Sequence, residues 1–144
     1  MSDSEAAKER ARLLYSTGDY SFWSSVFVPA SQVLVEAAGI GPGDRVLDVA
    51  AGDGNTALAA ARRGATVTAV DITPAQIERG RRRTDADGLA VEWLEADAQE
   101  LPFGDASFEC GLSTLGVALE PYGEQAAAEM FRVVVIVGIA AAPV

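Results

Sequence analysis

The chain has 144 residues, 49% of them apolar and 22% charged, a length and composition that favour one globular domain. Its 21 acidic and 11 basic residues give a net charge of −10, which argues against a nucleic-acid ligand because a phosphate backbone needs a basic surface. The sequence has no histidine and a single cysteine, Cys110. Histidine-based triads, histidine-containing zinc sites and internal disulfides are therefore excluded.

The N-terminal segment lacks the features of a signal peptide. Residues 1–14 carry acidic and basic side chains by turns and have no apolar core. The longest apolar run, residues 133–144, is too short to cross a bilayer as a helix. We therefore expect a cytoplasmic protein with no membrane partner.

Helical segments alternate with short apolar runs, which is typical of an α/β protein with a parallel sheet. A capping box at Ser2 and Glu5 predicts a helix to about residue 16, and a second helix is predicted over residues 24–38. Strands are predicted over 45–50, 65–71, 90–97, 107–116 and 133–141. Further helices are predicted over 56–63, from an N-cap at Thr73 to about 86, and over 123–131.

These elements predict a Rossmann-like, doubly wound parallel sheet in three layers with strand order 3-2-1-4-5. Residues 1–43 are expected to form an N-terminal helical segment and residues 44–144 the ligand-binding domain. The arginine cluster of the fourth predicted helix is interpreted as a solvated face; it consists of Arg79, Arg81, Arg82 and Arg83.

Three successive strands end in acidic residues. Asp48 closes the first strand, Asp71 the second and Asp97 the third. Because ligands of open parallel sheets bind outside the carboxyl ends of the strands, these carboxylates are expected to share one site. Gly52 and Gly54 follow the first strand, where the absence of a Cβ lets a ligand approach the backbone, and the next helix offers its amino terminus.

The glycine loop alone does not decide the ligand. The pattern from Gly52 to Ala57, with Asp71 19 positions after Gly52, also fits a dinucleotide site and leaves an NAD-dependent oxidoreductase as an alternative. A pyrophosphate, however, suits a site with added carboxylates poorly. A ligand with an ammonium, a sulfonium and an adenine amine suits it better, and S-adenosylmethionine has all three.

These residues resemble the class I S-adenosylmethionine-dependent methyltransferases, in particular the small-molecule branch of ubiquinone and menaquinone biosynthesis. VLDVAAGDGN is similar to the first family motif, TAVDITPAQI to the second, and EADAQELPFGDASFE to the third and fourth. The resemblance covers about residues 18–132. It implies methyl transfer to a small-molecule acceptor.

The resemblance also implies roles for individual residues. Asp48 would face the methionine ammonium, Asp71 would accept both ribose hydroxyls, and Asp97 would accept the adenine amine. The backbone of Ala50, Gly52 and Gly54 would line the methionyl and ribose parts. Adenine would be flanked by Ile72 and Gln76, with the Ala98 backbone on a ring nitrogen, and the remaining implied contacts are Ser113 below the cofactor and Tyr20 above it. No catalytic side chain and no metal is implied.

The sequence departs from the family after Arg132, where Val133 follows without the usual Pro-Gly-Gly turn. Either the last helix ends early, near Ala128, or the terminal segment is placed differently. The family's later strands and substrate cap are expected to be missing, so the chain is expected to be either an active methyltransferase or one inactivated by truncation. A non-catalytic cofactor-binding or interaction module is the other alternative. The exposed sheet edge also favours a homodimer.

Overall fold

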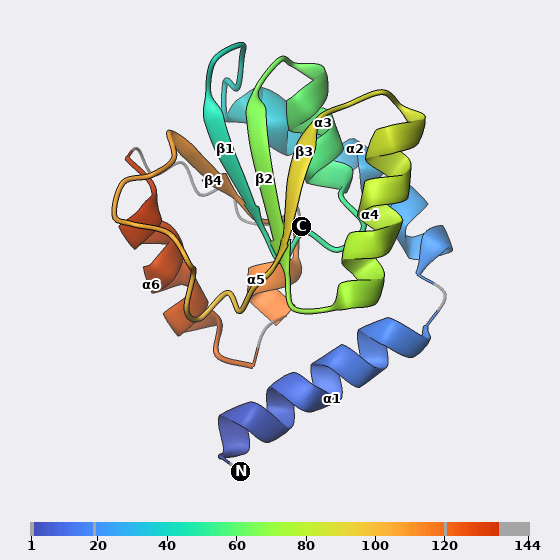
Figure 1. Cartoon of the computed structure of the whole chain (residues 1–144), viewed down its shortest axis with the longest axis vertical. Coiled ribbons are helices and arrows are strands. Elements are labelled where there is room, and N and C mark those ends of the chain that lie inside the picture. The colour runs from blue at the N-terminus through green and yellow to red at the C-terminus, as the bar shows by residue number, and fades with distance from the viewer. Residues whose placement is uncertain (1, 19, 120, 136–144) are drawn as a thin grey trace.

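The computed structural model describes residues 2–18, 20–119 and 121–135, which form an α/β structure around a parallel sheet (Figure 1). The four strands lie in the order β3-β2-β1-β4. Their bounds are β1 Arg45–Val49, β2 Thr66–Asp71, β3 Val91–Glu95 and β4 Cys110–Leu112. The predicted fold class, and the predicted order of the first four strands, are confirmed.

Helices cover both faces of the sheet and its carboxyl edge (Figure 1). The helices α2, α3 and α4 pack on one face, α6 packs on the other, and α1 crosses below the carboxyl ends of the strands. Within the described residues, no helix is long and apolar enough to cross a bilayer. The helices are α1 Asp3–Thr17, α2 Ser21–Ala37, α3 Asn55–Arg62, α4 Pro74–Ala86, α5 Gly116–Leu119 and α6 Gly123–Val133.

The strand register brings the predicted carboxylates to one edge. Asp48 pairs with Ala69 of β2, one position before the end of β1, and Asp71 pairs with Glu95 at the ends of β2 and β3. Because the strands are parallel, their carboxyl ends lie at the same edge of the sheet, and the loops after β1, β2 and β3 lie next to one another. This edge is the lower one in Figure 1.

Two apolar cores hold the layers together. Between the sheet and the helices α2, α3 and α4, alanines of α3 let the helix approach the strands closely, and Trp93 fills the space beside them. On the other face, Met130 and Val133 of α6 pack on Leu47 and Val49. Each core buries alternate residues of the same strands, as expected for a sheet covered on both sides.

Several predicted boundaries are wrong. The fourth strand is limited to Cys110–Leu112, with a separate parallel bridge between Phe108 and Val134. The last helix continues to Val133, so it does not end near Ala128. A fifth strand from Val133 is therefore wrong at its start, and residues 136–141 of it lie outside the described residues.

Two further differences concern helices. Thr73 is the N-cap of α4, but its side chain makes no capping hydrogen bond. The short helix α5 was not predicted, because its four residues show no helical periodicity. It lies where the end of the fourth strand and the following loop were predicted. The capping box of α1 is confirmed, because Ser2 accepts from the Glu5 N–H and Glu5 accepts from the Ser2 N–H.

Trp93 of β3 occupies the space at two glycines. A Cβ built on Gly80 of α4 would lie 2.2 Å from the indole, and one built on Gly54 would lie 2.6 Å from the same ring carbon. Glycine at these positions therefore makes room for the ring, and the ring in turn supports the loop that precedes α3.

We expect Gly80→Ala to lower the free energy of unfolding by about 1–3 kcal/mol, because the added methyl group overlaps Trp93. The same substitution in an unobstructed helix interior raises stability by about 0.5–1 kcal/mol. Urea denaturation measures the difference. Arg82→Ala, at an exposed position of α4, is the matched control and is expected to stay within about 0.5 kcal/mol of wild type. A more stable Gly80→Ala protein would contradict the packing described here.

Candidate functional site

A cavity of about 540 Å³ opens at the carboxyl edge of the sheet, a volume typical of small-molecule sites. The loops after β1 and β2 form one wall, and α1, α2 and residues 114–116, 119 and 121 form the others. Seven of the residues predicted from the sequence line this cavity: Tyr20, Asp48, Ala50, Gly52, Asp71, Ile72 and Gln76.

Asp48 is the most deeply buried carboxylate at this site. Its side chain is 1% exposed, and Oδ2 has no hydrogen-bond partner among the described residues. Burial raises its pKa from 3.8 to about 8; the backbone N–H of Ala57 opposes this shift and the nearby Asp71 adds to it. Asp48 lines the cavity, and one of its buried carboxyl oxygens has no hydrogen-bond partner among the described residues.

Asp71 joins the loops after β1 and β2. Its Oδ2 accepts the Gly52 N–H at 2.8 Å, and its Oδ1 accepts the Thr73 N–H at 2.8 Å. Burial raises the pKa of this carboxyl, while the two backbone N–H groups oppose the rise. A carboxylate has about four lone-pair positions, so both oxygens can still accept hydrogen bonds from the cavity side.

The loop between β1 and α3 has an unusual backbone. Gly52 has φ +57° and Gly54 has φ +96°, and these values favour glycine. Three described residues with side chains adopt the same region, and two of them lie at this site: Ala50 with φ 53° and Leu115 with φ 67°. Both line the cavity, where strained backbone is often found at functional positions.

Four predicted site residues do not line the cavity. Gly54 is the N-cap of α3 and lies against Trp93. Ala98 is buried in the core under α6, and Ser113 accepts a hydrogen bond from the Val117 N–H at 3.0 Å. Asp97 is the fourth, and the roles predicted for these residues stay predictions.

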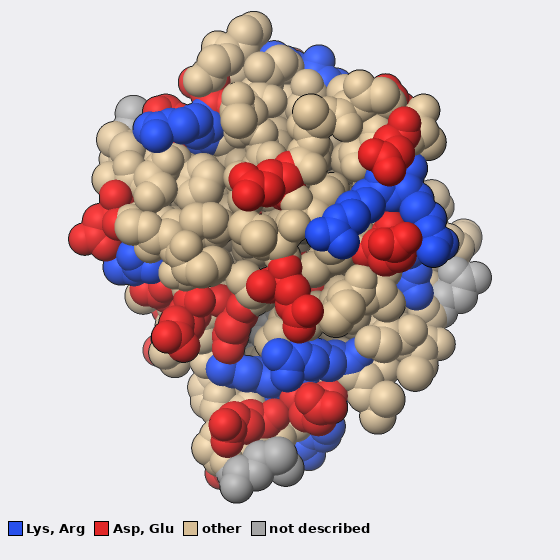
Figure 2. All heavy atoms as spheres, viewed as in Figure 1, with Lys and Arg blue, Asp and Glu red and all other residues tan. Residues whose placement is uncertain are grey.

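The Asp97 carboxylate is already engaged by the protein. Its Oδ2 lies 2.5 Å from Nζ of Lys8, and its Oδ1 accepts the Gln99 N–H at 2.9 Å. Arg12, one turn along α1, donates to the Ile72 carbonyl at 3.4 Å. In the lower part of Figure 2 a band of basic side chains lies between acidic ones, where α1 crosses the sheet edge. These contacts fix α1 across the cavity.

Several residues that line the cavity could not be identified from the sequence. A hydrogen-bonded row of hydroxyls connects three elements: Thr56 of α3 donates to Ser31 of α2 at 3.0 Å and lies 2.6 Å from the Thr114 hydroxyl. Residues of α1, such as Leu14, also line the cavity. Thr56, three residues after Asp53, could have been suspected from the motif, whereas nothing in α1 indicated a site.

The interpretation of the arginine cluster as a solvated face is wrong for Arg83. Its guanidinium lies 2.9 Å from Oδ1 of Asp53 and donates to the Asn55 side chain at 2.9 Å. Arg81 donates to the Trp93 carbonyl at 3.2 Å, whereas Arg82 pairs only with Glu78 on the surface of α4. The i, i+1 spacing of these arginines places them on different sides of the helix, which a count of charges does not reveal.

No group of acidic or cysteine side chains among the described residues could hold a metal ion. The site therefore consists of two buried carboxylates, a glycine loop and a largely apolar cavity.

Residues 46–138 match a family described as a methyltransferase domain. The chain belongs to this family. The match covers the four strands, apart from the first residue of β1, and the glycine loop, so the resemblance to class I S-adenosylmethionine-dependent methyltransferases is confirmed. S-adenosylmethionine is the cofactor that this family implies.

Individual relatives agree with the family match. An uncharacterized protein of Mycobacterium tuberculosis is 46% identical over 123 residues, which cover 85% of this chain and 45% of that protein. A demethylmenaquinone methyltransferase of Clavibacter sepedonicus is 37% identical over 112 residues, covering 78% of this chain and 42% of that protein. The chain thus spans less than half the length of these relatives.

A solved structure of a putative methyltransferase from Bacillus halodurans superimposes with a TM-score of 0.68 at 28% identity. The superposition covers 72% of this chain and 46% of the other. The methyltransferase fold therefore extends over most of the described residues.

The residues of the cavity fit the implied cofactor. Asp48 offers a buried oxygen without a partner, which an ammonium group would satisfy. Asp71 offers acceptor oxygens beside a loop where Gly52 has no Cβ and nothing within 4 Å of the position a Cβ would take. The cavity is also large enough for a nucleoside with an amino-acid tail.

Asp48 should make stability depend on pH. Because its pKa is raised from 3.8 to about 8, the folded protein holds a proton that the unfolded chain has lost, and the free energy of unfolding falls between these values as pH rises. Asp48→Asn removes this titration. We expect the variant to lose about 1–3 kcal/mol less stability than wild type between pH 5 and pH 8, measured by urea denaturation. Parallel pH profiles of the two proteins would contradict a protonated, buried Asp48.

The ion pair between Lys8 and Asp97 should hold α1 in place. We expect Lys8→Gln to speed amide hydrogen exchange in residues 3–17 by about threefold or more, because the helix then opens more often from the sheet edge. Exchange in β1 and β2 should be unchanged. Lys8→Arg retains the charge and is the matched control. Equal exchange of α1 in wild type and Lys8→Gln would show that the pair does not fasten the helix.

Proposed function

We propose that the chain binds S-adenosylmethionine in the cavity at the carboxyl edge and serves methyl transfer to a small-molecule acceptor. The observation that carries this proposal is the pair of buried carboxylates, Asp48 and Asp71, placed beside a glycine loop in one cavity of a methyltransferase fold. When bound, the cofactor supplies an activated methyl group, and the protein's task is to align the two reactants.

The contacts proposed for the cofactor follow the geometry of the cavity. Asp71 accepts the ribose hydroxyls, and Asp48 faces the ammonium group. Gly54, the N-cap of α3, supplies no side-chain cap; the N–H of Ala57 bonds to Asp48, and the N–H groups of Asn55 and Thr56 face the carboxylate of the methionyl part. Ile72 and Gln76 flank the adenine, and Tyr20 lies over the site. The backbone of Ala50, Gly52 and Gly54 completes the methionyl and ribose contacts.

The adenine end of this proposal requires a rearrangement. Asp97 accepts the adenine amine only if Lys8 moves away from its Oδ2 or shares it. The Ala98 backbone and Ser113 keep their proposed places beside the adenine and beneath the cofactor. α1 is thus the element whose position decides how the adenine is held.

The acceptor side of the cavity is mainly apolar. Leu14 of α1, Trp23 and Phe27 of α2 and Leu119 of α5 line it. Such a wall suits a small molecule with an apolar body, and demethylmenaquinone, the substrate named for one relative, is the first acceptor to test. The family match does not favour the NAD-dependent or the purely non-catalytic alternatives.

The proposed function also concerns domain organisation, location and self-association. Residues 1–43 form the helical cover and residues 44–144 the cofactor-binding domain. The protein acts in the cytoplasm, and it forms a homodimer through the exposed sheet edge. Turnover is tested separately from binding, because the matched relatives are about twice as long as the chain.

Calorimetric titration tests binding directly. We expect S-adenosylhomocysteine to bind the wild-type chain and NAD to give no heat of binding. We also expect mass spectrometry of the purified protein to detect S-adenosyl nucleosides. Release of S-adenosylhomocysteine in the presence of an acceptor measures turnover. Binding of NAD in preference to S-adenosylhomocysteine would overturn the proposed function.

Asp71→Ala should weaken the binding of S-adenosylhomocysteine by about 1–3 kcal/mol, which is about 5–150-fold in Kd, because the ribose hydroxyls lose their acceptor. Asp85→Ala removes an exposed carboxylate of α4 and is the matched control, with an unchanged Kd. Circular dichroism spectra of both variants show whether the fold is retained. A folded Asp71→Ala protein with wild-type affinity would remove Asp71 from the site.

A further inference from the structure

The glycine loop is held from outside the cavity by one side chain of α4. Arg83 donates through Nη1 to the Asp53 carbonyl at 3.0 Å and lies 2.9 Å from Oδ1 of the same residue, while its Nη2 donates to Oδ1 of Asn55 at 2.9 Å. A single guanidinium thus bonds to the backbone and side chain of Asp53, which lies between the two loop glycines. It also bonds to the side chain of Asn55, the first residue of α3.

The helix α2 is tied to the same point. Ser24 donates to Oδ1 of Asp53 at 2.8 Å, and its carbonyl accepts from the Asn55 side chain at 2.7 Å. Nη1 of Arg83 also lies 3.4 Å from the Ser24 hydroxyl. These four residues, Ser24, Asp53, Asn55 and Arg83, form what we call the Arg83 clamp, which joins α2, the glycine loop and α4.

Three members of the clamp line the cavity, namely Ser24, Asp53 and Asn55, but Arg83 does not. Its side chain is 33% exposed and that of Asp53 is 18% exposed, so the pair is better shielded from water than an ordinary surface ion pair. Arg83 therefore acts on a ligand only through the residues that it holds.

The clamp has an electrostatic consequence. Asp53 precedes α3 and lines the cavity beside the amino terminus of that helix, where the dipole favours an anion. Without a partner, the negative charge of Asp53 would lie close to the position of a ligand's carboxylate and would repel it. Pairing with Arg83 offsets that charge and leaves the N–H groups at the start of α3 for the ligand.

We propose that Arg83 is a positioning residue for cofactor binding: it fixes the loop of residues 52–55 and neutralises Asp53, so that the start of α3 accepts the carboxylate of the methionyl part. The inference rests on the proposed function for the identity of the ligand. Arg83 does not line the cavity, and its positive charge serves to neutralise Asp53.

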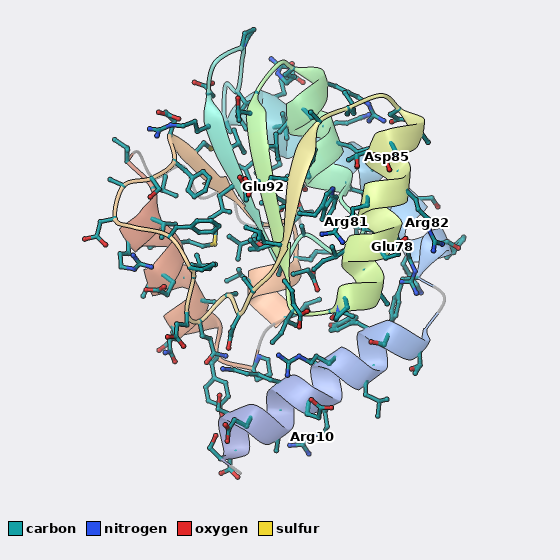
Figure 3. The ribbon with its side chains drawn as sticks, viewed as in Figure 1. Arg10, Glu78, Arg81, Arg82, Asp85 and Glu92 are labelled. Atoms are coloured by element: carbon teal, nitrogen blue, oxygen red, sulfur yellow. The ribbon has the colours of Figure 1, made fainter. Side chains whose placement is uncertain are left out.

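The test compares Arg83→Gln with Arg82→Gln. Figure 3 shows Arg82 pointing away from the sheet on α4 and Arg81 pointing toward β3, so Arg82→Gln removes an equal charge from the same helix without touching the clamp. The ligands are S-adenosylhomocysteine and 5′-methylthioadenosine, which has the adenosine and thioether but no carboxylate. Calorimetry gives the dissociation constants of both ligands for wild type and for the two variants.

We expect Arg83→Gln to weaken S-adenosylhomocysteine at least about fivefold, and by clearly more than it weakens 5′-methylthioadenosine. Arg83→Lys should recover part of the loss, and adding Asp53→Asn to Arg83→Gln should recover part of it by removing the unpaired charge. A general loss of structure would weaken both ligands alike and would not respond to Asp53→Asn. A smaller loss, or an equal loss for the two ligands, overturns the proposal when wild type binds S-adenosylhomocysteine.

Hydrogen exchange separates this inference from the proposed function. Arg83→Gln should speed exchange of residues 52–57 relative to wild type and to Arg82→Gln, whether or not the chain binds the nucleoside. If wild type binds neither nucleoside, the proposed function fails and the cofactor role of Arg83 fails with it, while faster exchange still supports the clamp on the loop. Unchanged exchange overturns the clamp itself. If Arg83→Gln does not fold, Arg83→Lys replaces it in the exchange experiment: an ammonium group cannot hold Asp53 and Asn55 as a guanidinium does, so residues 52–57 should still exchange faster than in wild type, and unchanged exchange overturns the clamp.

Discussion

The carboxylate of Asp71 joins two loops that are far apart in sequence, and the rest of the site depends on it. Its oxygens accept N–H groups of Gly52, after β1, and Thr73, after β2. The parallel register of β1 and β2 makes this contact reachable, because both strands end on the same side. A side chain without two acceptor oxygens at this position would leave at least one of the two backbone donors without an acceptor.

This arrangement concentrates energetically unfavourable features, namely buried carboxyl groups and strained backbone, at the carboxyl edge of the sheet. Two carboxylates are buried close enough for Asp71 to raise the pKa of Asp48, and Ala50 and Leu115 hold positive φ angles. Such features persist only where the surrounding packing is strong enough to impose them. Here the support comes from Trp93 behind Gly54 and from the row of hydroxyls through Thr56. The cores stabilise a site that would be unstable by itself.

Local signals explain what the sequence could predict. Strands β1 and β2, the glycine loop and the carboxylates at the strand ends follow from apolar runs, turn residues and the rule that parallel strands end together. The position of α1 could not be predicted, because its contact with Asp97 depends on one lysine, Lys8, among alternating charges. The side of α4 on which Arg83 lies, and the short length of β4, also depend on packing between distant elements.

The N-terminal helices are part of the site, although they carry no recognisable motif. Helix α2 packs on α3, and Ser24 and Ser31 connect it to the glycine loop and to Thr56. Helix α1 is fixed to the loops after β2 and β3 through Arg12 and Lys8. A ligand in the cavity would therefore contact surfaces from both the helical segment and the sheet. Residues of α1 and α2 therefore bear on affinity as directly as those of the glycine loop do.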